Sequence, residues 1–525
     1  MMIRNARGRR YGSLLTLVTG FTAVAAALPA SSEVWSFVGS RYQAMGGAGV
    51  AVVDDSLAQY WNPGALGFMR GWDAQLPVGG SYSIENRALE SLSNLFQAAD
   101  DAQAAVDAIP GGDLSGENLS LVLGLVDEFT QIGLDGQSLQ GNLDIGLLGH
   151  VNRIGFGALS LTSVNIRPLF DTSGGLAIGT SAVDAVGMAC MPECDSPTNT
   201  DLSLQIAMDN PDWDDGPPGG GPTYADQLVA SAEMGGVDTT DPANAALLQQ
   251  IAADTANGST TLDANDAIGA DIQGLSTQEI GISYGHPIPM PFFEPLDGKI
   301  AIGGVLKYML GISYSKFTAY DGSEDIGDLI ANAVSFDNVK TSHNVGLDLG
   351  MLAQPCDWLR VGLVARNVNS PSFDRNVDVL GQQGDFVLEP QVRMGVAVMP
   401  FENWIVASDL DLTENSTLEV PSFDSRLFSV GTEYTLPVSW ATLAFRLGGF
   451  LNVANLQNND YALTAGLGMR FGNFLLEFGA GTSFKTEQFV TSSKETSTLP
   501  TRLNAGINLR WESRPEGTRR YTGHF

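Results

Sequence analysis

Residues 501–511 read TRLNAGINLRW, and this stretch decides the fold class because its side chains alternate strictly. Every second position is apolar, and the positions between them are polar or small. A period of two places successive side chains on opposite faces of a β-strand. The same alternation recurs in YALTAGLGMRF at 461–471 and in LRVGLVAR at 359–366. The second half of the chain therefore predicts strands that each have one apolar face.

The predicted strands are connected by loops of two kinds. Length and alternation together give about fourteen strands, near 75–84, 141–150, 153–165, 277–286, 298–317, 339–353, 357–368, 384–398, 402–413, 424–436, 440–452, 459–471, 473–484 and 498–511. Short turns such as NRIG, QPCDW and GN follow even-numbered strands, and longer loops follow most odd-numbered ones. Outer-membrane β-barrels are built in this way. A soluble β-sandwich would show the same alternation, but it gives no reason for short turns at one end of the strands and long loops at the other.

A closed barrel would satisfy every backbone group in lipid, where water is absent. Four tryptophans fall at the short-turn ends of the strands, as an interfacial belt would: Trp358, Trp404, Trp440 and Trp511. The inward faces carry charges of both signs, which predicts pairing across the lumen rather than a catalytic array. We expect no enzyme activity and no cofactor.

Charge and targeting limit the function classes further. The net charge of -32 argues against nucleic acid as a partner. Residues 1–32 combine four arginines, an apolar run and small residues, which predicts a signal peptide. A membrane anchor is the alternative, but the run is short and ends in Pro29. The chain is expected in the outer membrane, among its lipid and lipopolysaccharide.

Two insertions interrupt the predicted barrel of residues 75–511. Residues 88–138 have apolar residues at helical spacing and predict two amphipathic helices on the outer rim. Residues 168–275 contain seventeen acidic residues and neither Lys nor Arg, which predicts an extracellular insertion. Within it, DPANAALLQQIAADTA predicts a helix with Asp241 as N-cap and Pro242 at its first position.

The acidic insertion contains two weak candidate sites. The carboxylates of Asp209, Asp212, Asp214 and Asp215 could bind Ca²⁺ through oxygen ligands, although their spacing fits no EF-hand. A solvated acidic loop is the simpler interpretation. Cys190 and Cys194 predict a small-loop disulfide in an exported chain. Free thiols or a soft-metal pair remain alternatives.

The last strand carries a second signal. Asn504, Gly506, Leu509 and Trp511 resemble the pattern by which the barrel-assembly machinery recognises the final strand of an outer-membrane protein. Residues 512–525 follow as a periplasmic tail, and Pro515 and Gly517 make this tail a poor strand.

Residues 45–66 precede the first strand and read MGGAGVAVVDDSLAQYWNPGAL. A barrel of this size has a lumen too wide for wall side chains to fill. The small residues can thread tightly, the acidic pair can cap a short helix SLAQYW, and the last motif can form a turn. Residues 33–74 therefore predict a hatch inside the barrel, with this motif: Gly46, Gly47, Gly49, Asp54, Asp55, Trp61, Asn62, Pro63 and Gly64.

Residues 42–66 resemble the N-terminal box of the FadL-like outer-membrane proteins, and they are most similar to the TraF-like (conjugal transfer) and PorV-like branch. LRVGLVARNVNSPSF at 359–373 also resembles the TraF-like branch, and Gly64 replaces the usual Ala. The resemblance implies a fourteen-stranded barrel with its N-terminus inside. FadL-like members carry hydrophobic compounds passively across the outer membrane. The resemblance implies no ligand residues that can be matched here.

These observations predict passive uptake of hydrophobic small molecules. The main alternative is a non-transporting scaffold or a barrel that works with secretion or conjugal-transfer machinery, and the third is a polar porin. The wall of an outer pocket between the insertions distinguishes them. An apolar cavity favours uptake, a filled one favours the scaffold, and an open polar channel favours the porin.

Overall fold

The computed structural model describes residues 30–31, 34–93, 137–170, 197–216, 220–234, 237–256, 268–289, 296–319, 339–375, 385–416, 424–454, 461–490 and 496–513. The predicted signal peptide before residue 30, most of the helical insertion, Cys190, Cys194 and the tail after residue 513 lie outside these residues. At the start of the helical insertion, residues 88–93 are helical.

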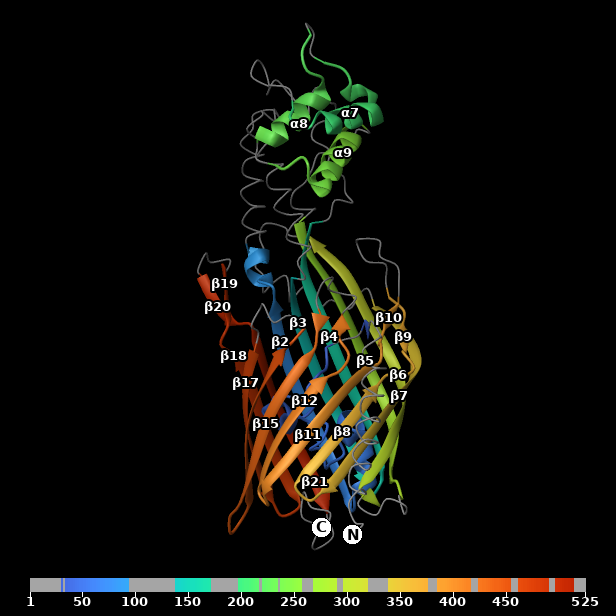
Figure 1. The fold of residues 1–525 in the computed structure, drawn as a ribbon, viewed down its shortest axis with the longest axis vertical. Helices are drawn as coiled ribbons and strands as arrows, with labels where there is room; N and C mark the ends of the chain where they lie inside the picture. Colours follow the sequence, from blue (N-terminus) through green and yellow to red (C-terminus); the bar gives the residue numbers. More distant parts are fainter. Residues whose placement is uncertain are drawn as a thin grey trace, which may run out of the picture.

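Fourteen antiparallel strands close into one barrel, as the alternation predicts (Figure 1). They are β2 (Trp72–Glu85), β3 (Ser138–Val151), β4 (Ile154–Phe170), β5 (Ile268–Pro287), β6 (Ile300–Ala319), β7 (Val339–Cys356), β8 (Leu359–Arg366), β11 (Gln391–Phe401), β12 (Trp404–Asp411), β15 (Leu427–Pro437), β16 (Thr442–Asn452), β17 (Tyr461–Phe471), β18 (Phe474–Ser483) and β21 (Arg502–Ser513). The barrel closes where β2 pairs with β21. The predicted fold class is confirmed.

Several predicted boundaries were wrong. The strand predicted at 384–398 is divided, because Pro390 has no N–H for the ladder. Its first part is β10 (Phe386–Val387), which pairs with β9 (Ser372–Phe373) instead of the barrel. β4 and β5 extend further than predicted and continue their pairing to Phe170 and Ile268, so the acidic insertion is shorter than 168–275.

The two faces of each barrel strand differ in polarity. On β3, Leu143, Ile145 and Leu147 are 48%, 44% and 62% exposed, whereas Asp144 between them is buried. The exposed set forms an apolar outer band, and Trp358, Trp440 and Trp511 are more than half exposed at its short-turn rim. An apolar outer band with a polar interior is the pattern of an outer-membrane barrel.

Three helices of the acidic insertion pack on one another beyond the long-loop end of the barrel (Figure 1). They are α7 (Thr200–Asp209), α8 (Tyr224–Met234) and α9 (Pro242–Ala256), with Trp213 fully buried among them. Pro242 is the first residue of α9, as predicted. Among the described residues, no helix is long and apolar enough to cross a membrane.

Candidate functional site

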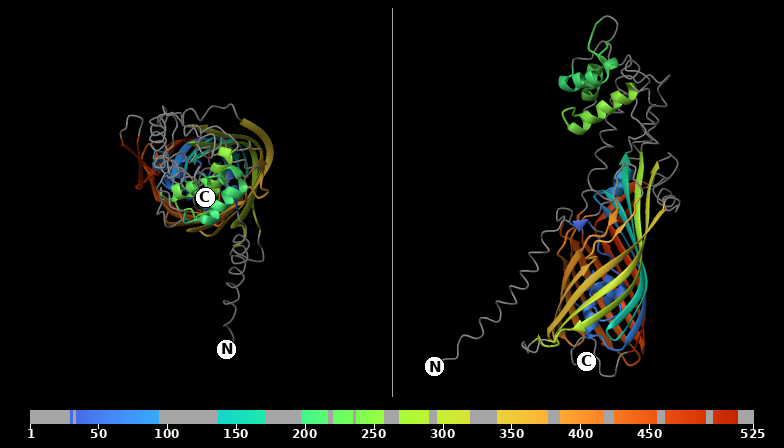
Figure 2. Two further views of the ribbon diagram at one scale, coloured as in Figure 1. Left: turned by 90° about the horizontal axis from the view of Figure 1, so that it is seen from above. Right: turned by 90° about the vertical axis from the view of Figure 1, so that its right-hand side faces the viewer.

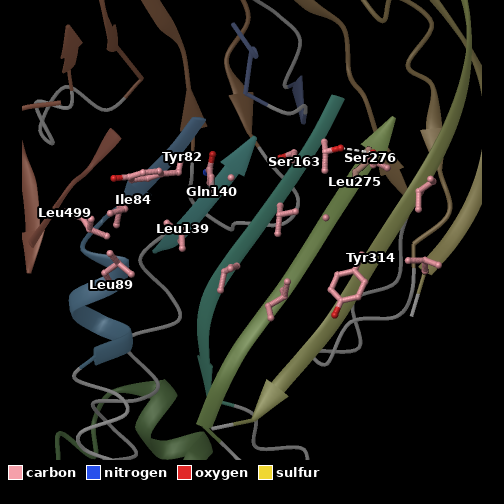
Figure 3. A pocket seen from close by; sticks show the side chains of 18 of the residues that line it. Tyr82, Ile84, Leu89, Leu139, Gln140, Ser163, Leu275, Ser276, Tyr314 and Leu499 are labelled. Carbon is pink, nitrogen blue, oxygen red and sulfur yellow. Dashed lines mark hydrogen bonds between the residues drawn. The ribbon is translucent and has the colours of Figure 1, made fainter. Parts of the chain in front are cut away.

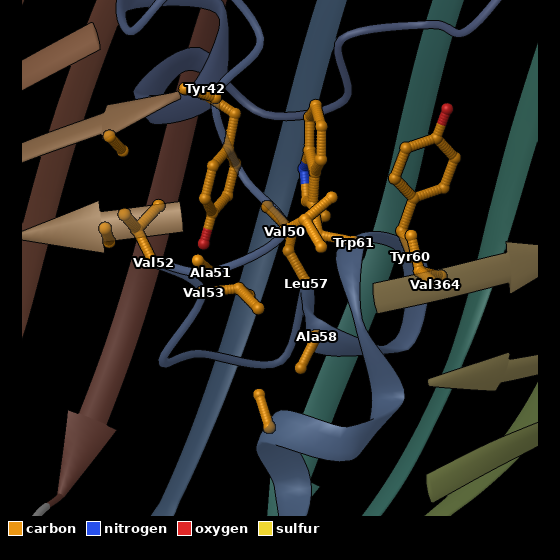
Figure 4. Close-up of a cluster of buried hydrophobic side chains, with 14 of the residues drawn as sticks. Tyr42, Val50, Ala51, Val52, Val53, Leu57, Ala58, Tyr60, Trp61 and Val364 are labelled. Atoms are coloured by element: carbon orange, nitrogen blue, oxygen red, sulfur yellow. The ribbon is translucent and has the colours of Figure 1, made fainter. Parts of the chain in front are cut away.

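Residues 34–69, here called the luminal segment, lie inside the ring of strands (Figure 2). They form α2 (Ser40–Ala44), α3 (Ala58–Trp61) and the 3-10 helix η1 (Pro63–Phe68). Tyr42 and Trp61 are fully buried with their rings 5.0 Å apart, at the centre of an apolar cluster (Figure 4). Helix α3 begins at Ala58, two residues after the start of the predicted helix SLAQYW, and the Asp55 carboxylate accepts from the Leu57 amide just before it, as a capping side chain does.

Buried ion pairs hold α2 to the barrel wall. Arg41 donates to Glu433 on β15 at 2.9 Å and to Asp54 at 2.7 Å. Glu433 also accepts from Arg446 on β16 at 2.6 Å, and Arg446 continues to Glu477 on β18 at 2.7 Å. All these side chains are buried. Removing one partner of such a network leaves an uncompensated buried charge.

The second aspartate of the acidic pair binds the adjoining part of the wall, where β21 and β2 follow β18. Asp55 accepts from Arg510 on β21 at 2.6 Å, from Gln75 on β2 at 3.2 Å and from the Tyr42 hydroxyl at 3.1 Å. Its other local bond is to the Leu57 amide at 3.0 Å. Asp54 thus pairs with Arg41 within the segment, whereas Asp55 bonds both to the segment and to the last strand.

Two further contacts fix the middle of the luminal segment. Asp409 on β12 accepts from the Gly49 and Val50 amides, each at 2.8 Å. Asn62 donates to the Val50 and Met351 carbonyls, each at 3.0 Å, and accepts from the Gly64 amide at 3.0 Å. Asn62 therefore organises the turn and joins it to β7 at the same time.

The segment packs on the wall where both backbones lack side chains. A Cβ at Gly46 would lie 2.5 Å from the Gly449 backbone, and a Cβ at Gly64 would lie 2.8 Å from the Leu352 amide. The absence of a side chain at position 64 thus permits the close approach of the segment to β7. Inward glycines of the wall face the segment all around the barrel: Gly303, Gly350, Gly362, Gly395, Gly431, Gly448, Gly466, Gly479 and Gly506.

Two small cavities lie next to the luminal segment among the described residues. One cavity next to Trp35 and Phe37 has a volume of about 60 Å³. Another, between Tyr60 and Leu388, has about 20 Å³. Phe373 and Phe386 of the β9–β10 hairpin also fill part of the lumen, where they pack on Leu275 and Met309.

A much larger apolar cavity lies on the outer face of the barrel. Its volume is about 530 Å³, and none of the described residues that line it is charged. Its wall consists mainly of outward-facing residues of β2 to β7 (Figure 3): Tyr82, Ile84, Leu139, Gly141, Val164, Ile166, Ile272, Gly274, Ile312, Tyr314 and Val339. We call this cavity the outer pocket. It lies outside the lumen, because Leu139 and Gly141 share the face of the exposed residues Leu143 and Ile145.

Polar side chains separate the outer pocket from most of the lipid-facing band on β4 and β5. Thr162 and Ser276 bond each other at 2.7 Å, and Gln278 donates to Ser160 at 2.7 Å and to Ser276 at 3.0 Å. These groups satisfy one another and mark the upper edge of the band. The outer pocket is therefore on the long-loop side of this edge. A large apolar surface beyond this row of polar side chains is a mark of a binding site.

The free edge of the outer pocket is formed by two elements beyond the barrel. Leu89 comes from the helical residues 88–93, and Phe489 and Leu499 come from the hairpin of β19 (Thr486–Val490) and β20 (Thr496–Pro500). Glu487 accepts from the Leu89 amide at 3.2 Å and joins the two elements. Burial raises the pKa of the Glu487 carboxyl, although the hydrogen bond from Leu89 opposes the shift.

The remaining predicted site residues are distributed over the acidic insertion, the last strand and residues outside the described ones. Asp209, Asp212, Asp214 and Asp215 are exposed at the end of α7 and after it, and no group of three or more metal-binding side chains occurs among the described residues. Asn504 and Gly506 face inward on β21, with Leu509 and Trp511 exposed on its outer face. Cys190 and Cys194 cannot be placed, and Cys356 is a free thiol.

The sequence interpretation missed two features. The inward glycines are distributed over many strands, and only their position on the inward face of each strand distinguishes them from other glycines. The outer pocket combines residues from six strands, a helical segment and a hairpin, so no local pattern encodes it. The sequence indicated it only through the apolar residues at outward positions of β4 and β5, beyond the predicted ends of these strands.

Comparisons with known proteins give one sequence family and several solved structures. The family described as "F plasmid transfer operon, TraF, protein" matches residues 217–411, in agreement with the TraF-like resemblance stated above. No curated protein matches the chain. The toluene transporter TbuX of Ralstonia pickettii is 12% identical over 91% of this chain and 98% of its own, with a TM-score of 0.41.

Two other solved structures match a similar share of this chain. The toluene transporter TodX of Pseudomonas putida is 11% identical over 92% of this chain and 100% of its own, with a TM-score of 0.39. A FadL homologue of Pseudomonas aeruginosa is 9% identical over 91% of this chain and 99% of its own, also with a TM-score of 0.39.

Proposed function

We propose that this outer-membrane β-barrel takes up hydrophobic small molecules passively and captures them in the outer pocket. The observation that carries the proposal is the uncharged, apolar cavity of about 530 Å³ on the outer wall, at the long-loop end of β2 to β7. Ligand pockets typically have volumes of about 300–1,000 Å³ and mostly apolar walls. Two hydroxyls in the wall, those of Thr162 and Ser276, already bond each other, so they need no polar group from a ligand.

The luminal segment fits the same proposal, in which it acts as a hatch that closes the lumen. It occupies the lumen, and its removal would expose Glu433, Asp409 and Arg510, which are charged groups that water can hydrate. The charged wall makes the lumen a poor place for an apolar ligand to bind. Capture is therefore assigned to the outer pocket, and closure of the lumen to the hatch.

A scaffold role is the second candidate, because two observations favour it. The luminal segment is held by buried ion pairs at both α2 and Asp55, which favours a static plug. The three helices of the acidic insertion have their own apolar core around Trp213 and could dock a partner.

Binding of 1-decylpyrene, an uncharged fluorescent probe, tests the outer pocket. A Cβ at Gly141 meets nothing within 4 Å, so Gly141→Leu projects into the cavity without a clash. We expect the dissociation constant to rise at least about tenfold, which corresponds to roughly 1.4 kcal/mol. Gly304→Leu is the matched control, since position 304 lies on the outer band of β6 with contacts of 3.4 and 3.5 Å. Equal affinities in both variants would remove the outer pocket as the capture site.

A further inference from the structure

Two arginines at the short-turn end of the barrel have no carboxylate partner among the described residues. Arg70 follows the luminal segment and precedes β2, and Arg153 lies in the turn between β3 and β4. Arg70 donates to the Met69 carbonyl at 2.7 Å, and neither arginine pairs with an acidic side chain in the part of the chain that the structure describes. The chain has 59 acidic and 27 basic residues, so arginines without an acidic partner are unexpected in it.

Backbone hydrogen bonds hold the two arginines on neighbouring segments. The Asn152 amide donates to the Gly71 carbonyl at 2.6 Å, and the Gly71 amide donates to the Asn152 side chain at 3.1 Å. Arg70 and Arg153 are the sequence neighbours of these two residues. Burial and repulsion from the Arg153 guanidinium lower the pKa of Arg70, so the two charges are close enough to interact. Neighbouring guanidiniums without a carboxylate offer hydrogen bonds and charge to an anion.

An apolar row of the outer wall lies directly beside the arginines. It consists of paired, outward residues of β2, β3, β4 and β5, namely Trp72, Val151, Ile154 and Tyr284. Each of these side chains is at least 40% exposed. Trp and Tyr are enriched where a membrane meets water. The short turns of outer-membrane barrels face the periplasm, so this row lies at the level of the inner leaflet.

Charge and apolar surface together select the class of ligand. Guanidinium groups bind phosphate through two parallel hydrogen bonds, and basic residues at a membrane surface attract anionic lipids. The apolar row offers contact to acyl chains, which a soluble anion lacks. The net charge of -32 repels anions from the protein as a whole, so binding of an anion must come from local groups.

We infer that Arg70 and Arg153 bind the phosphate of an anionic phospholipid from the inner leaflet, with its acyl chains on the row from Trp72 to Tyr284. This site goes beyond the proposed function, because it lies at the opposite end of the strands from the outer pocket. Arg70 follows the last residue of the luminal segment. A bound lipid therefore also fixes the place where this segment joins the barrel wall.

Native mass spectrometry of the full chain tests the site by titration with dioleoylphosphatidylglycerol. Arg70→Gln and Arg153→Gln should each raise the dissociation constant of the first bound lipid about fivefold, since a basic residue near lipid headgroups contributes roughly 1 kcal/mol. Arg87→Gln is the matched control, because Arg87 is an exposed arginine at the long-loop end that already pairs with Glu90. This variant should bind the lipid like the unmodified protein.

Two further probes separate the parts of the ligand. Dioleoylglycerol has the acyl chains without the phosphate, and glycerol 3-phosphate has the phosphate without the chains. We expect both to bind more weakly than the phospholipid. Dioleoylglycerol that binds equally well would show that the arginines contribute nothing. Glycerol 3-phosphate that binds equally well would assign them to a soluble phosphate, and either result would overturn the lipid site.

The site is also overturned if both glutamine variants bind phosphatidylglycerol as tightly as Arg87→Gln does. Arg153→Glu provides a second test, because its carboxylate would pair with Arg70 and should abolish the preference for phosphatidylglycerol over dioleoylglycerol. Folding of each variant is checked by its heat-modifiable mobility in a denaturing gel. None of these measurements involves the outer pocket, so this site and the proposed function fail separately.

Discussion

Gly46 lies where the luminal segment comes closest to the barrel wall. Its φ of 66° is in the left-handed region, and a Cβ there would lie 2.5 Å from the Gly449 backbone. Gly472 has a similar φ of 58°, but a Cβ there meets nothing within 4 Å. Both glycines thus have a left-handed backbone conformation, and only Gly46 also packs closely on another part of the backbone.

Alanine substitution at the two positions separates these effects. Gly472→Ala should cost only about 1 kcal/mol, the penalty of the left-handed conformation. Gly46→Ala adds a clash with rigid backbone and should displace the luminal segment. Hydrogen exchange of the amides of residues 40–50 measures the difference, and we expect lost protection only in Gly46→Ala. Equal protection in both variants would show that the close packing on Gly449 does not hold the segment.

Glu233 connects α8 to the start of α7 in the three-helix unit. Its carboxylate accepts from the Thr198 and Asn199 amides at 2.7 and 2.9 Å and from the Thr239 hydroxyl at 3.0 Å. Burial raises the pKa of Glu233, but these hydrogen bonds outweigh it and leave the pKa below its ordinary value of 4.5. The charged carboxylate is therefore the form that stabilises the unit.

The lowered pKa of Glu233 predicts that the stability of the three-helix unit depends on pH. Because the pKa is lowered in the folded state, the stabilisation is present above pH 4.5 and is lost as the pH falls through the folded-state pKa. Glu233→Gln should reduce the protection of α7 amides at pH 7, and the difference from the unmodified protein should shrink as the pH falls below 4.5. Hydrogen exchange corrected for intrinsic rates measures this difference. A difference that does not change with pH would contradict the assignment.

At the scale of elements, the strands were predictable and the site was predictable only in part. Alternation identifies all fourteen barrel strands, because each strand has one apolar face that points outward and one polar or small-residue face that points inward. The division near Pro390 was missed, since alternation continues on both sides of it. The luminal segment was predicted from residues 45–66, but its partners Glu433, Asp409 and Arg510 are hundreds of residues away. Only the closed fold brings them together.

The whole molecule combines a filled lumen with an apolar outer wall. If residues 45–66 plug the lumen, the intact protein should be silent in planar bilayers, and a variant that lacks these residues should pass a steady ionic current. The charged inward side chains that the deletion exposes would line the conducting path. Silence from both proteins, with folded barrels, would show that wall side chains and the β9–β10 hairpin close the lumen, and it would favour the scaffold.

The location of bound ligand tests the central claim most directly. Diffraction from crystals soaked with 1-bromododecane would locate the bromine by its anomalous signal. We predict a peak in the outer pocket, among Ile84, Gly141 and Tyr314 on the outer face of the barrel. A peak inside the lumen next to Trp61, or no peak in the unmodified protein at saturating ligand, would contradict capture on the outer wall.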